Sequence, residues 1–444
     1  MHSNMKLPAT TKSHLYWFLF LLISVALVNS FLIDKHFSAD GVYYFFLILQ
    51  KGTFVHHDWA RQYSLYLTQW PAVLALQLGV KDVTVLNRLF ALGIYSVYLI
   101  SFLLCDLALR KNDKTLLIWP LISMVALNFT TDYHLSGEYP VVMLLAWPIL
   151  FFLVRTRLNQ AERVILILLM VVYSRIYQTA MASSLVFAGL LVYQYFFRKS
   201  GRSNFELYIL LLFAAMIFAI GLYTTIYPFS DANKSAFLDG LPLIFQNKPL
   251  CISVLFMVLF VFGSAYRKSW LYAVSLFPLL FYLWTLFNSG PGISAYISFA
   301  SRTVSTFILP LFLITSLFFH YRGFRFRRIP LLIISAFIVL MVAGNIRYSV
   351  DWRNYKKEFV SVLNNHSGFV SVEKTTLLNN PCHWMWTNPF LSLAWSDGCV
   401  TSIVLNQPLP GASFGKPFRH LKWKKYVSYS KVFLAVDSTV RICP

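Results

Sequence analysis

The stretch 164–197, VILILLMVVYSRIYQTAMASSLVFAGLLVYQYFF, decides how this chain is organised. As one helix its 34 residues would be about 51 Å long at 1.5 Å per residue, whereas roughly 30 Å of hydrocarbon needs about 20 residues. Two shorter helices, broken at 174–178, fit a bilayer better. Because Arg163 precedes the stretch and Arg198 follows it, the sequence predicts a hairpin whose two ends lie on the same side of a membrane.

The composition agrees with this interpretation. Of the 444 residues 58% are hydrophobic and only 12% are charged, while soluble proteins carry about 25% charge. So little polar surface excludes a soluble particle of this size, and the same composition excludes disorder, collagen, a coiled coil and a small disulfide scaffold. The net charge of +21 does not indicate nucleic-acid binding, because Lys and Arg form short clusters between apolar runs.

These basic clusters predict the topology. They recur at 110–114, 155–163, 198–202, 267–268 and 322–328, and the positive-inside rule assigns each of them to the cytoplasm. The chain must cross the membrane an even number of times between successive clusters. Each interval contains an apolar stretch that is interrupted near its middle, and the predicted breaks, all external, lie at 131–138, 174–178, 227–249 and 288–302.

The remaining segments complete a prediction of about eleven transmembrane helices. A first helix at 15–33 is retained rather than cleaved, because it lacks a small-residue cleavage pattern and exceeds a signal core in length. The run 65–79 is short, contains Pro71, and is placed on the membrane surface. With helices at 85–109 and 330–347, the amino terminus lies inside and the carboxyl terminus outside.

The predicted fold class is therefore an all-α polytopic membrane protein with a small external domain. The transmembrane domain covers 1–347, and its first external loop, 34–84, carries juxtamembrane helices. The residues 348–444 form a small C-terminal external α/β domain.

The first external loop holds the most informative polar residues. They are Asp34, Lys35, His36 and Asp40 before an apolar run at 42–49, and His56, His57, Asp58 and Arg61 after it. Asp40 with Gly41 is typical of a helix start, where free backbone amides and the helix dipole favour a carboxylate. Two interpretations stay open for Asp40: a helix cap, or a catalytic carboxylate that faces a lipid-borne substrate.

The other external breaks add candidates close to the bilayer surface, where ionisable groups pair or line a site. They are Asp132, His134, Glu138, Arg175, Asp231, Lys234, Asp239 and Arg302. Glu138 is either a helix cap or a functional acid. Arg175 needs a counter-charge, which a substrate phosphate or a carboxylate would supply equally well. Arg302 either extends to the interface or anchors a lipid phosphate, which a guanidinium fork suits.

Metal and nucleotide motifs are missing from the sequence. His56 and His57 are adjacent and cannot share one helix face, and no HExxH or CxxC pattern occurs, so no metal site is assigned. A divalent cation held by Asp40 and a second carboxylate stays open. Neither GxxxxGK[ST] nor GxSxG occurs, so ATP is not the expected energy source.

The tail carries three of the five cysteines. Cys382 and Cys399 could form a disulfide in an oxidising exterior, and Cys443 would then be unpaired. Between them lie His383 and three tryptophans, at 384, 386 and 395. These aromatic residues form either a sugar platform or, as we favour, the core of a small domain or its membrane interface.

The arrangement resembles the GT-C superfamily of polytopic glycosyltransferases. The segment 38–88 carries most of the likeness: Asp40 precedes a short juxtamembrane helix, Arg61 and Pro71 follow, and Asn87 with Arg88 opens the second helix. Glu138 and Arg302 match later external acidic and basic positions. In this chain Gly41, and not a second acidic residue, follows Asp40. In that superfamily the first external loop supplies the catalytic acid residue, and the sugar comes from a polyprenyl-phosphate carrier.

The resemblance implies an inverting displacement by a hexosyl or pentosyl transferase. Asp40 would accept the proton of an acceptor hydroxyl on an envelope glycan, a lipid or a protein. Arg302, with Arg175 or Arg61 as alternatives, would hold the leaving polyprenyl phosphate. The remaining implied site residues are Glu138 as a second catalytic acid, Asp132 as its alternative in orienting the acceptor or binding a cation, and His57 and His134 in substrate binding.

Three other interpretations stay open. A transporter or flippase would place its charges near the bilayer midplane. A lipid-linked glycan polymerase or ligase would rely on arginines in large external loops. In a structural scaffold Asp40 could be replaced without loss. The expected location is a bacterial inner membrane with the site facing the periplasm. Sequons at Asn128, Asn233 and Asn365 leave the lumen of a eukaryotic endoplasmic reticulum open.

Overall fold

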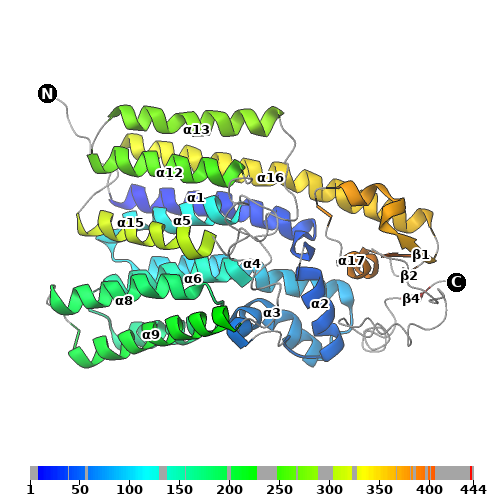
Figure 1. Ribbon diagram of the computed structural model, residues 1–444, viewed down its shortest axis with the longest axis horizontal. Helices are drawn as coiled ribbons and strands as arrows, with labels where there is room; N and C mark the ends of the chain where they lie inside the picture. Colours follow the sequence, from blue (N-terminus) through cyan, green and yellow to red (C-terminus); the bar gives the residue numbers. More distant parts are fainter. Residues whose placement is uncertain are drawn as a thin grey trace.

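A computed structural model shows a bundle of long helices with shorter elements at one end (Figure 1). It describes residues 9–38, 40–55, 59–129, 138–155, 157–197, 202–227, 248–266, 269–288, 304–322, 328–366, 368–380, 382–383, 387–395, 399–400, 402–405 and 441–442.

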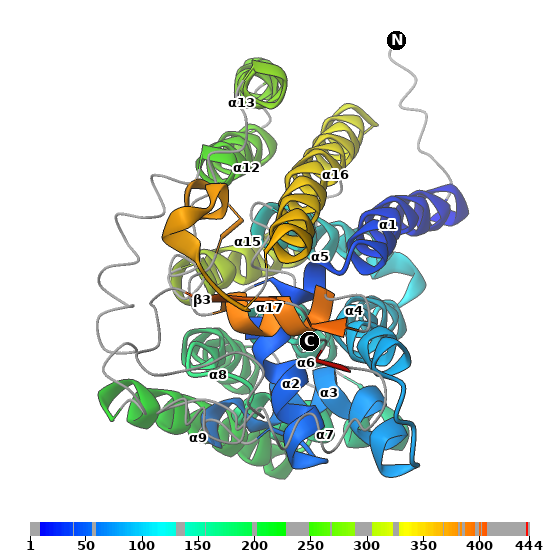
Figure 2. The ribbon, with the colours of Figure 1, turned by 90° about the vertical axis from the view of Figure 1, so that its right-hand side faces the viewer.

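The long helices run side by side with roughly parallel axes, and Figure 2 looks along them. They are α1 (Ala9–Leu32), α4 (Val83–Ala108), α6 (Glu138–Val154), α7 (Gln160–Ser174), α8 (Ala180–Phe196), α9 (Asn204–Ile226), α12 (Lys248–Tyr266), α13 (Ser269–Asn288), α15 (Leu309–Tyr321) and α16 (Arg328–Asn365). A further run joins η3 (Lys111–Leu117), α5 (Ile118–Ser123) and the π-helix η4 (Met124–Asn128), while a second π-helix, η7 (Val304–Ile308), leads into α15.

The predicted break at 174–178 is confirmed, because α7 ends at Ser174 and α8 begins at Ala180. The other three predicted breaks, at 131–138, 227–249 and 288–302, lie mostly outside the described residues. Described helices end before them at Asn128, Ile226 and Asn288, and described helices begin after them at Glu138, Lys248 and Val304. The hairpin that 164–197 predicts is therefore α7 and α8. Its two helices have 15 and 17 residues, which makes each about 23–26 Å long and close to the hydrocarbon thickness.

The apolar helices identify an integral membrane protein. Four helical segments of the described chain are long and apolar enough to span a bilayer: His14–Leu32, Val83–Ala108, Asn204–Ile226 and Ile329–Asn365. Shorter apolar helices accompany them at Tyr139–Val154, Ala180–Phe196, Leu250–Gly263 and Thr306–Tyr321. The total of eleven spans stays a prediction, as does the direction in which the bundle crosses the membrane.

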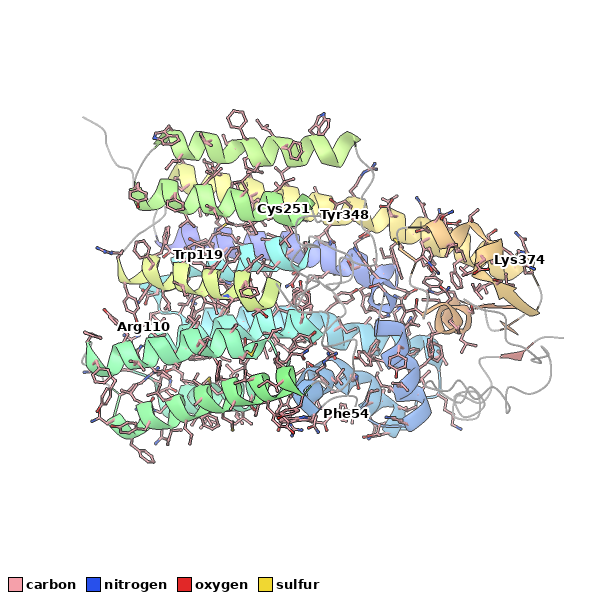
Figure 3. All side chains as sticks on the ribbon, viewed as in Figure 1. Phe54, Arg110, Trp119, Cys251, Tyr348 and Lys374 are labelled. Carbon is pink, nitrogen blue, oxygen red and sulfur yellow. The ribbon has the colours of Figure 1, made fainter. Side chains whose placement is uncertain are left out.

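Helix α16 is longer than the sequence predicts. We expect its end at 347, but it continues to Asn365 and, with 38 residues, is about 57 Å long. The end of the helix after Tyr348 extends past the rest of the bundle (Figures 1 and 3). The predicted division between the domains, after 347, therefore falls inside one continuous helix.

The end of the bundle beyond which α16 extends is called the loop end. It carries η1 (Lys35–Phe37), α2 (Asp40–Lys51), η2 (Trp59–Arg61) and α3 (Gln62–Gln77). Helix α3 packs closely on α4 where α4 has Gly93. A Cβ atom at this position would lie 2.1 Å from the carbonyl oxygen of Thr68, so only glycine fits there. The run 65–79, which the sequence predicts on the membrane surface, lies mostly in α3, and its residues Trp70 and Leu74 are exposed.

The tail contains short elements at the loop end. They are β1 (Gly368–Ser371), η8 (Val372–Lys374), η9 (Thr376–Asn379), α17 (Asn388–Trp395), β2 (Cys399–Val400), β3 (Ser402–Leu405) and β4 (Arg441–Ile442). Strand β1 pairs in parallel with β3, and β2 pairs in parallel with β4. Trp395 is buried against Trp352 and Phe359, with ring centroids 5.6 and 5.3 Å away, which confirms a core role for this tryptophan.

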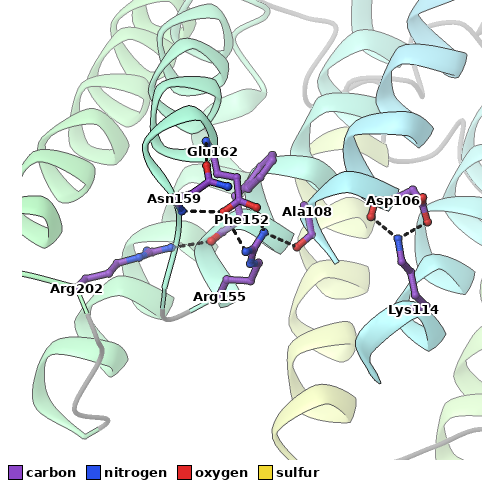
Figure 4. A network of polar contacts seen from close by, with 8 residues as sticks. All are labelled: Asp106, Ala108, Lys114, Phe152, Arg155, Asn159, Glu162 and Arg202. Carbon is purple, nitrogen blue, oxygen red and sulfur yellow. Dashed lines mark hydrogen bonds and ion pairs between the residues drawn. The ribbon is translucent and has the colours of Figure 1, made fainter. Parts of the chain in front are cut away.

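The opposite end of the bundle, where Figure 3 labels Arg110, is called the basic end. Here charged side chains hold the ends of the helices (Figure 4). Arg155 binds Glu162 through two contacts of 2.6 and 3.0 Å, while Arg202 donates to the carbonyl oxygen of Phe152 over 2.6 Å. Asn159 and Glu162 form a capping box that starts α7. Two arginines of the basic clusters that predict the topology, Arg155 and Arg202, thus also bind carbonyl groups near the ends of α4 and α6.

Candidate functional site

The first loop turns sharply at Asp34 before it reaches α2. Asp34 has φ 58° and ψ 33°, and it is the one residue other than glycine with positive φ among those the structure describes. This left-handed conformation is uncommon for residues with a Cβ atom and persists only where the surroundings hold it in place.

Three side chains hold the Asp34 carboxylate. Lys356 Nζ lies 2.6 Å from Oδ2, and Asn87 Nδ2 donates to Oδ1 over 3.1 Å. Arg88 Nη1 lies 3.4 Å from Oδ1 and also donates to the carbonyl oxygen of Phe31 over 2.9 Å. The group formed by Asp34, His36, Asn87, Arg88 and Lys356 is called the Asp34 cluster, and it joins the first loop to α4 and α16.

Burial and charge compete at the Asp34 carboxyl. Burial alone would raise its pKa, but the charge and hydrogen bond of Lys356, with the charge of Arg88, hold that pKa below its ordinary value. Asp34 is therefore a carboxylate at neutral pH and is fully engaged in the fold. These contacts leave it a structural role and not the role of a proton acceptor.

His36 is buried and neutral. Burial lowers its pKa to about 4, against the opposing effects of Asn87 and Asp34. Nε2 donates to Asn87 Oδ1 over 2.5 Å, because the amide nitrogen of Asn87 is already directed to Asp34. The proton of the neutral ring is thus on Nε2, and Asn87 connects this uncharged ring to Asp34.

Asp40 is the first residue of α2, which confirms the predicted helix start. Its side chain lies outside the described part of the structure. The next amide, of Gly41, donates to the carbonyl oxygen of Ser38 over 3.2 Å. Phe45 of α2 packs on Phe90 of α4, with ring centroids 5.7 Å apart. Asp40 thus starts a helix that the bundle holds from one side.

A second cluster brings together two of the predicted phosphate-binding residues. Arg61 is 7% exposed and its guanidinium lies 4.9 Å from the ring centroid of Tyr177. Arg175 lies over the rings of Trp59 and Tyr63, at 5.4 and 5.7 Å, and its Nε donates to the carbonyl oxygen of Trp59 over 3.1 Å. These five residues form the arginine cluster, which contains two guanidinium groups and three aromatic rings.

The arginine cluster forms because two loops meet. Helix α7 ends at Ser174 and η2 ends at Arg61, and the amide of Tyr63 donates to the carbonyl oxygen of Arg175 over 3.1 Å. The Trp59 ring also lies 6.1 Å from that of Tyr223, near the end of α9. The cluster therefore lies at the loop end, with 44% of Trp59 and 55% of Tyr223 exposed.

The other predicted site residues have no described side chain. Glu138 begins α6, which confirms a helix start there, but its side chain lies outside the described residues. The same holds for the residues His57, Asp132, His134 and Arg302, whose backbone is outside them as well. Within the described chain no group of three His, Cys, Asp or Glu residues could hold a metal ion. The cation that the sequence leaves open between Asp40 and a second carboxylate lies outside these residues, because the Asp40 side chain is not described.

The sequence reasoning missed several residues of both clusters. The sequence predicts that Lys356 belongs to a separate external domain, yet Lys356 binds Asp34 of the first loop. Tyr63 and Tyr177 are not among the candidates from the sequence, although each lies two residues after an arginine that is. That proximity of aromatic residues to arginines is the signal that could have found them.

Comparisons with known proteins add no relative. No family model, no curated protein and no solved structure matches this chain. The resemblance to GT-C glycosyltransferases therefore rests on the sequence alone, mainly on the residues of 38–88.

Proposed function

We propose that this protein is a polytopic membrane glycosyltransferase of GT-C type, and that it moves a sugar from a polyprenyl-phosphate carrier to an acceptor hydroxyl. The observation that carries the proposal is the arginine cluster. It offers two cations beside aromatic rings at one end of an apolar bundle. A phosphate attached to a long apolar chain needs this combination, because its head requires charge and its tail remains in lipid.

The reaction would proceed in one displacement. The acceptor oxygen forms a bond to the anomeric carbon while the bond from that carbon to the phosphate oxygen breaks. The proton of the hydroxyl passes to Asp40, and the electron pair of the broken bond leaves with the polyprenyl phosphate. Since phosphate is a good leaving group, one base and cationic stabilisation suffice. Arg61 and Arg175 would supply that stabilisation.

The position of the arginine cluster favours this function over a transporter. Transport sites lie near the bilayer midplane on interrupted helices. The arginine cluster instead lies where α7 ends and α8 begins, and its exposed Trp59 has the amphipathic character of residues at a membrane interface. We propose that this interface faces the periplasm at a bacterial inner membrane, because Arg110, Arg155 and Arg202 lie at the other end of the bundle.

The test compares envelope glycans by mass spectrometry in cells that carry the wild-type protein, no protein, Asp40→Asn or Asp82→Asn. Asp82 is the matched control: it starts α4, accepts hydrogen bonds from Thr84 and Val85 over 2.8 and 3.2 Å, and remains a good cap as asparagine. Membrane levels of the variants must be equal.

A sugar should disappear without the protein and with Asp40→Asn, but not with Asp82→Asn. Loss of a general base lowers a rate by about 10²- to 10⁴-fold. If Asp40→Asn behaves like Asp82→Asn, Asp40 is a helix cap and the proposed mechanism is wrong.

A further inference from the structure

The C-terminal part of the chain contacts the segment that carries Asp40 in two places. At the first place, Lys356 of α16 binds Asp34 at 2.6 Å, six residues before Asp40. Trp352, one turn earlier on α16, donates from Nε1 to the carbonyl oxygen of Ile33 over 3.0 Å. These contacts fix the turn from which α2 starts.

The second place is the face of α2 that does not meet α4. Phe390 of α17 packs on Tyr43 and Phe46, with ring centroids 5.7 and 5.9 Å away. Because Phe45 faces Phe90 of α4, α2 lies between the bundle and the tail. Figure 2 shows α17 beside α2 at the loop end.

The two contacts are themselves connected. Lys356 Nζ lies 5.7 Å from the ring centroid of Trp395, the last residue of α17. One turn of helix along from Lys356, Phe359 packs on the same ring at 5.3 Å. The Asp34 turn, α16 and α17 therefore form one connected unit around α2.

We infer that Lys356 and Phe390 are positioning residues, which hold α2 and thereby set the place of Asp40. The catalytic part of this inference rests on the proposed function. The structural part does not, because the stability of α2 can be measured without any substrate. A base must lie within hydrogen-bond reach of the proton it accepts, and small displacements of catalytic groups cost large factors in rate. The tail is thus part of the site and not a separate domain beside it.

The test measures hydrogen–deuterium exchange of the full-length protein in detergent micelles, peptide by peptide. Lys356→Met should raise exchange in peptides covering 38–51 by about tenfold or more, since a charge-assisted hydrogen bond to a buried carboxylate is lost. Lys357→Met is the matched control, because Lys357 is exposed on the same helix. Lys356→Arg should restore the protection, and Phe390→Leu should give a smaller increase limited to α2.

Two results would overturn the inference. In the first, Lys356→Met has the same exchange in 38–51 as the wild type, which would mean that α2 is held without the tail. In the second, exchange in Lys356→Met rises equally throughout the chain, which would mean that Lys356 stabilises the whole fold and not α2 in particular. Envelope glycans measured in the same variants separate the two proposals. If α2 loosens and the sugar is still added at the wild-type level, Lys356 positions α2, but Asp40 is not the base.

Discussion

Arg175 donates from Nε to the carbonyl oxygen of Trp59 over 3.1 Å, and this bond joins two loops 116 residues apart. The same guanidinium lies over the rings of Trp59 and Tyr63. It is therefore fixed in direction before any ligand arrives. A fixed guanidinium loses less side-chain entropy on binding than a free one, which suits it to a phosphate.

Replacing Arg175 with lysine should lower sugar transfer by about tenfold or more, although the charge is kept. Lysine has neither the planar fork nor the stacking on two aromatic rings. The amount of product glycan per unit of membrane protein measures the effect. Arg157→Lys is the control, because Arg157 is exposed near the basic end. Equal activity of both variants would remove Arg175 from the phosphate site.

Protein stability should fall as pH drops below 6.5, because His36 must stay neutral in the fold. The unfolded chain binds a proton near pH 6.5 and the folded chain only near pH 4. The unfolded state thus binds more protons between these values, and the free energy of unfolding falls by about 2 kcal/mol from pH 7 to pH 5. Thermal unfolding in detergent at both pH values measures this loss. The His36→Gln variant should lose clearly less stability between pH 7 and pH 5. A loss equal to that of the wild type would mean that another group titrates.

The pair Arg155–Glu162 should stabilise the basic end. Both side chains are largely buried, at 14% and 12% exposure. Glu162→Gln leaves the guanidinium without its counter-charge but keeps an acceptor for the capping box, so we expect a loss of about 2–3 kcal/mol. A double-mutant cycle with Arg155→Met, read from unfolding in mixed micelles, measures the coupling. A coupling energy near zero would show that the pair contributes nothing.

Gly93→Ala should destabilise the contact between α3 and α4 by about 3 kcal/mol. Its Cβ would lie 2.1 Å from the backbone oxygen of Thr68 and 2.9 Å from Cδ of Pro71, so the two helices must separate. Gly189→Ala is the matched control, because nothing lies within 4 Å of a Cβ there. That change should be neutral or raise stability by up to about 1 kcal/mol. Similar unfolding temperatures for both variants would contradict the close packing.

Labelling with a membrane-impermeant maleimide tests the odd number of crossings. Arg110 and Lys374 are exposed at opposite ends of the molecule (Figure 3). In a protein without its native cysteines, Lys374→Cys should react in intact cells and Arg110→Cys only after the membrane is opened. The reverse pattern would turn the bundle over, and reaction of both in intact cells would contradict a bundle that spans the bilayer.

The helix breaks could be predicted because a bilayer limits the length of an apolar helix. The segment 164–197 is too long for one span, and its polar middle is where α7 ends and α8 begins. The same reasoning failed for α16, because hydrophobicity ends near Arg347 while helical structure does not. The interval between Gly344 and Gly368 contains neither glycine nor proline, and that absence indicated a longer helix.

The Asp34 cluster could not be predicted, since its ion pair forms between residues of distant segments. No local pattern connects Asp34 with Lys356, and aspartate at a left-handed turn is visible only in the backbone. The arginine cluster was partly predictable. Arg61 and Arg175 were separate candidates from their positions in external loops, but their proximity depends on how η2 packs beside the end of α7.

The contact between Asp34 and Lys356 also sets an order in time. The two residues are 322 positions apart, and ribosomes add about 5–20 residues per second. The first loop is therefore translated roughly 15–65 seconds before its last partner exists. During synthesis Asp34 must remain without that lysine, and in a nascent chain that stalls before α16 only Asn87 and Arg88 can hold its carboxylate. The full set of contacts around Asp34 therefore forms only after α16 has been made as far as Lys356.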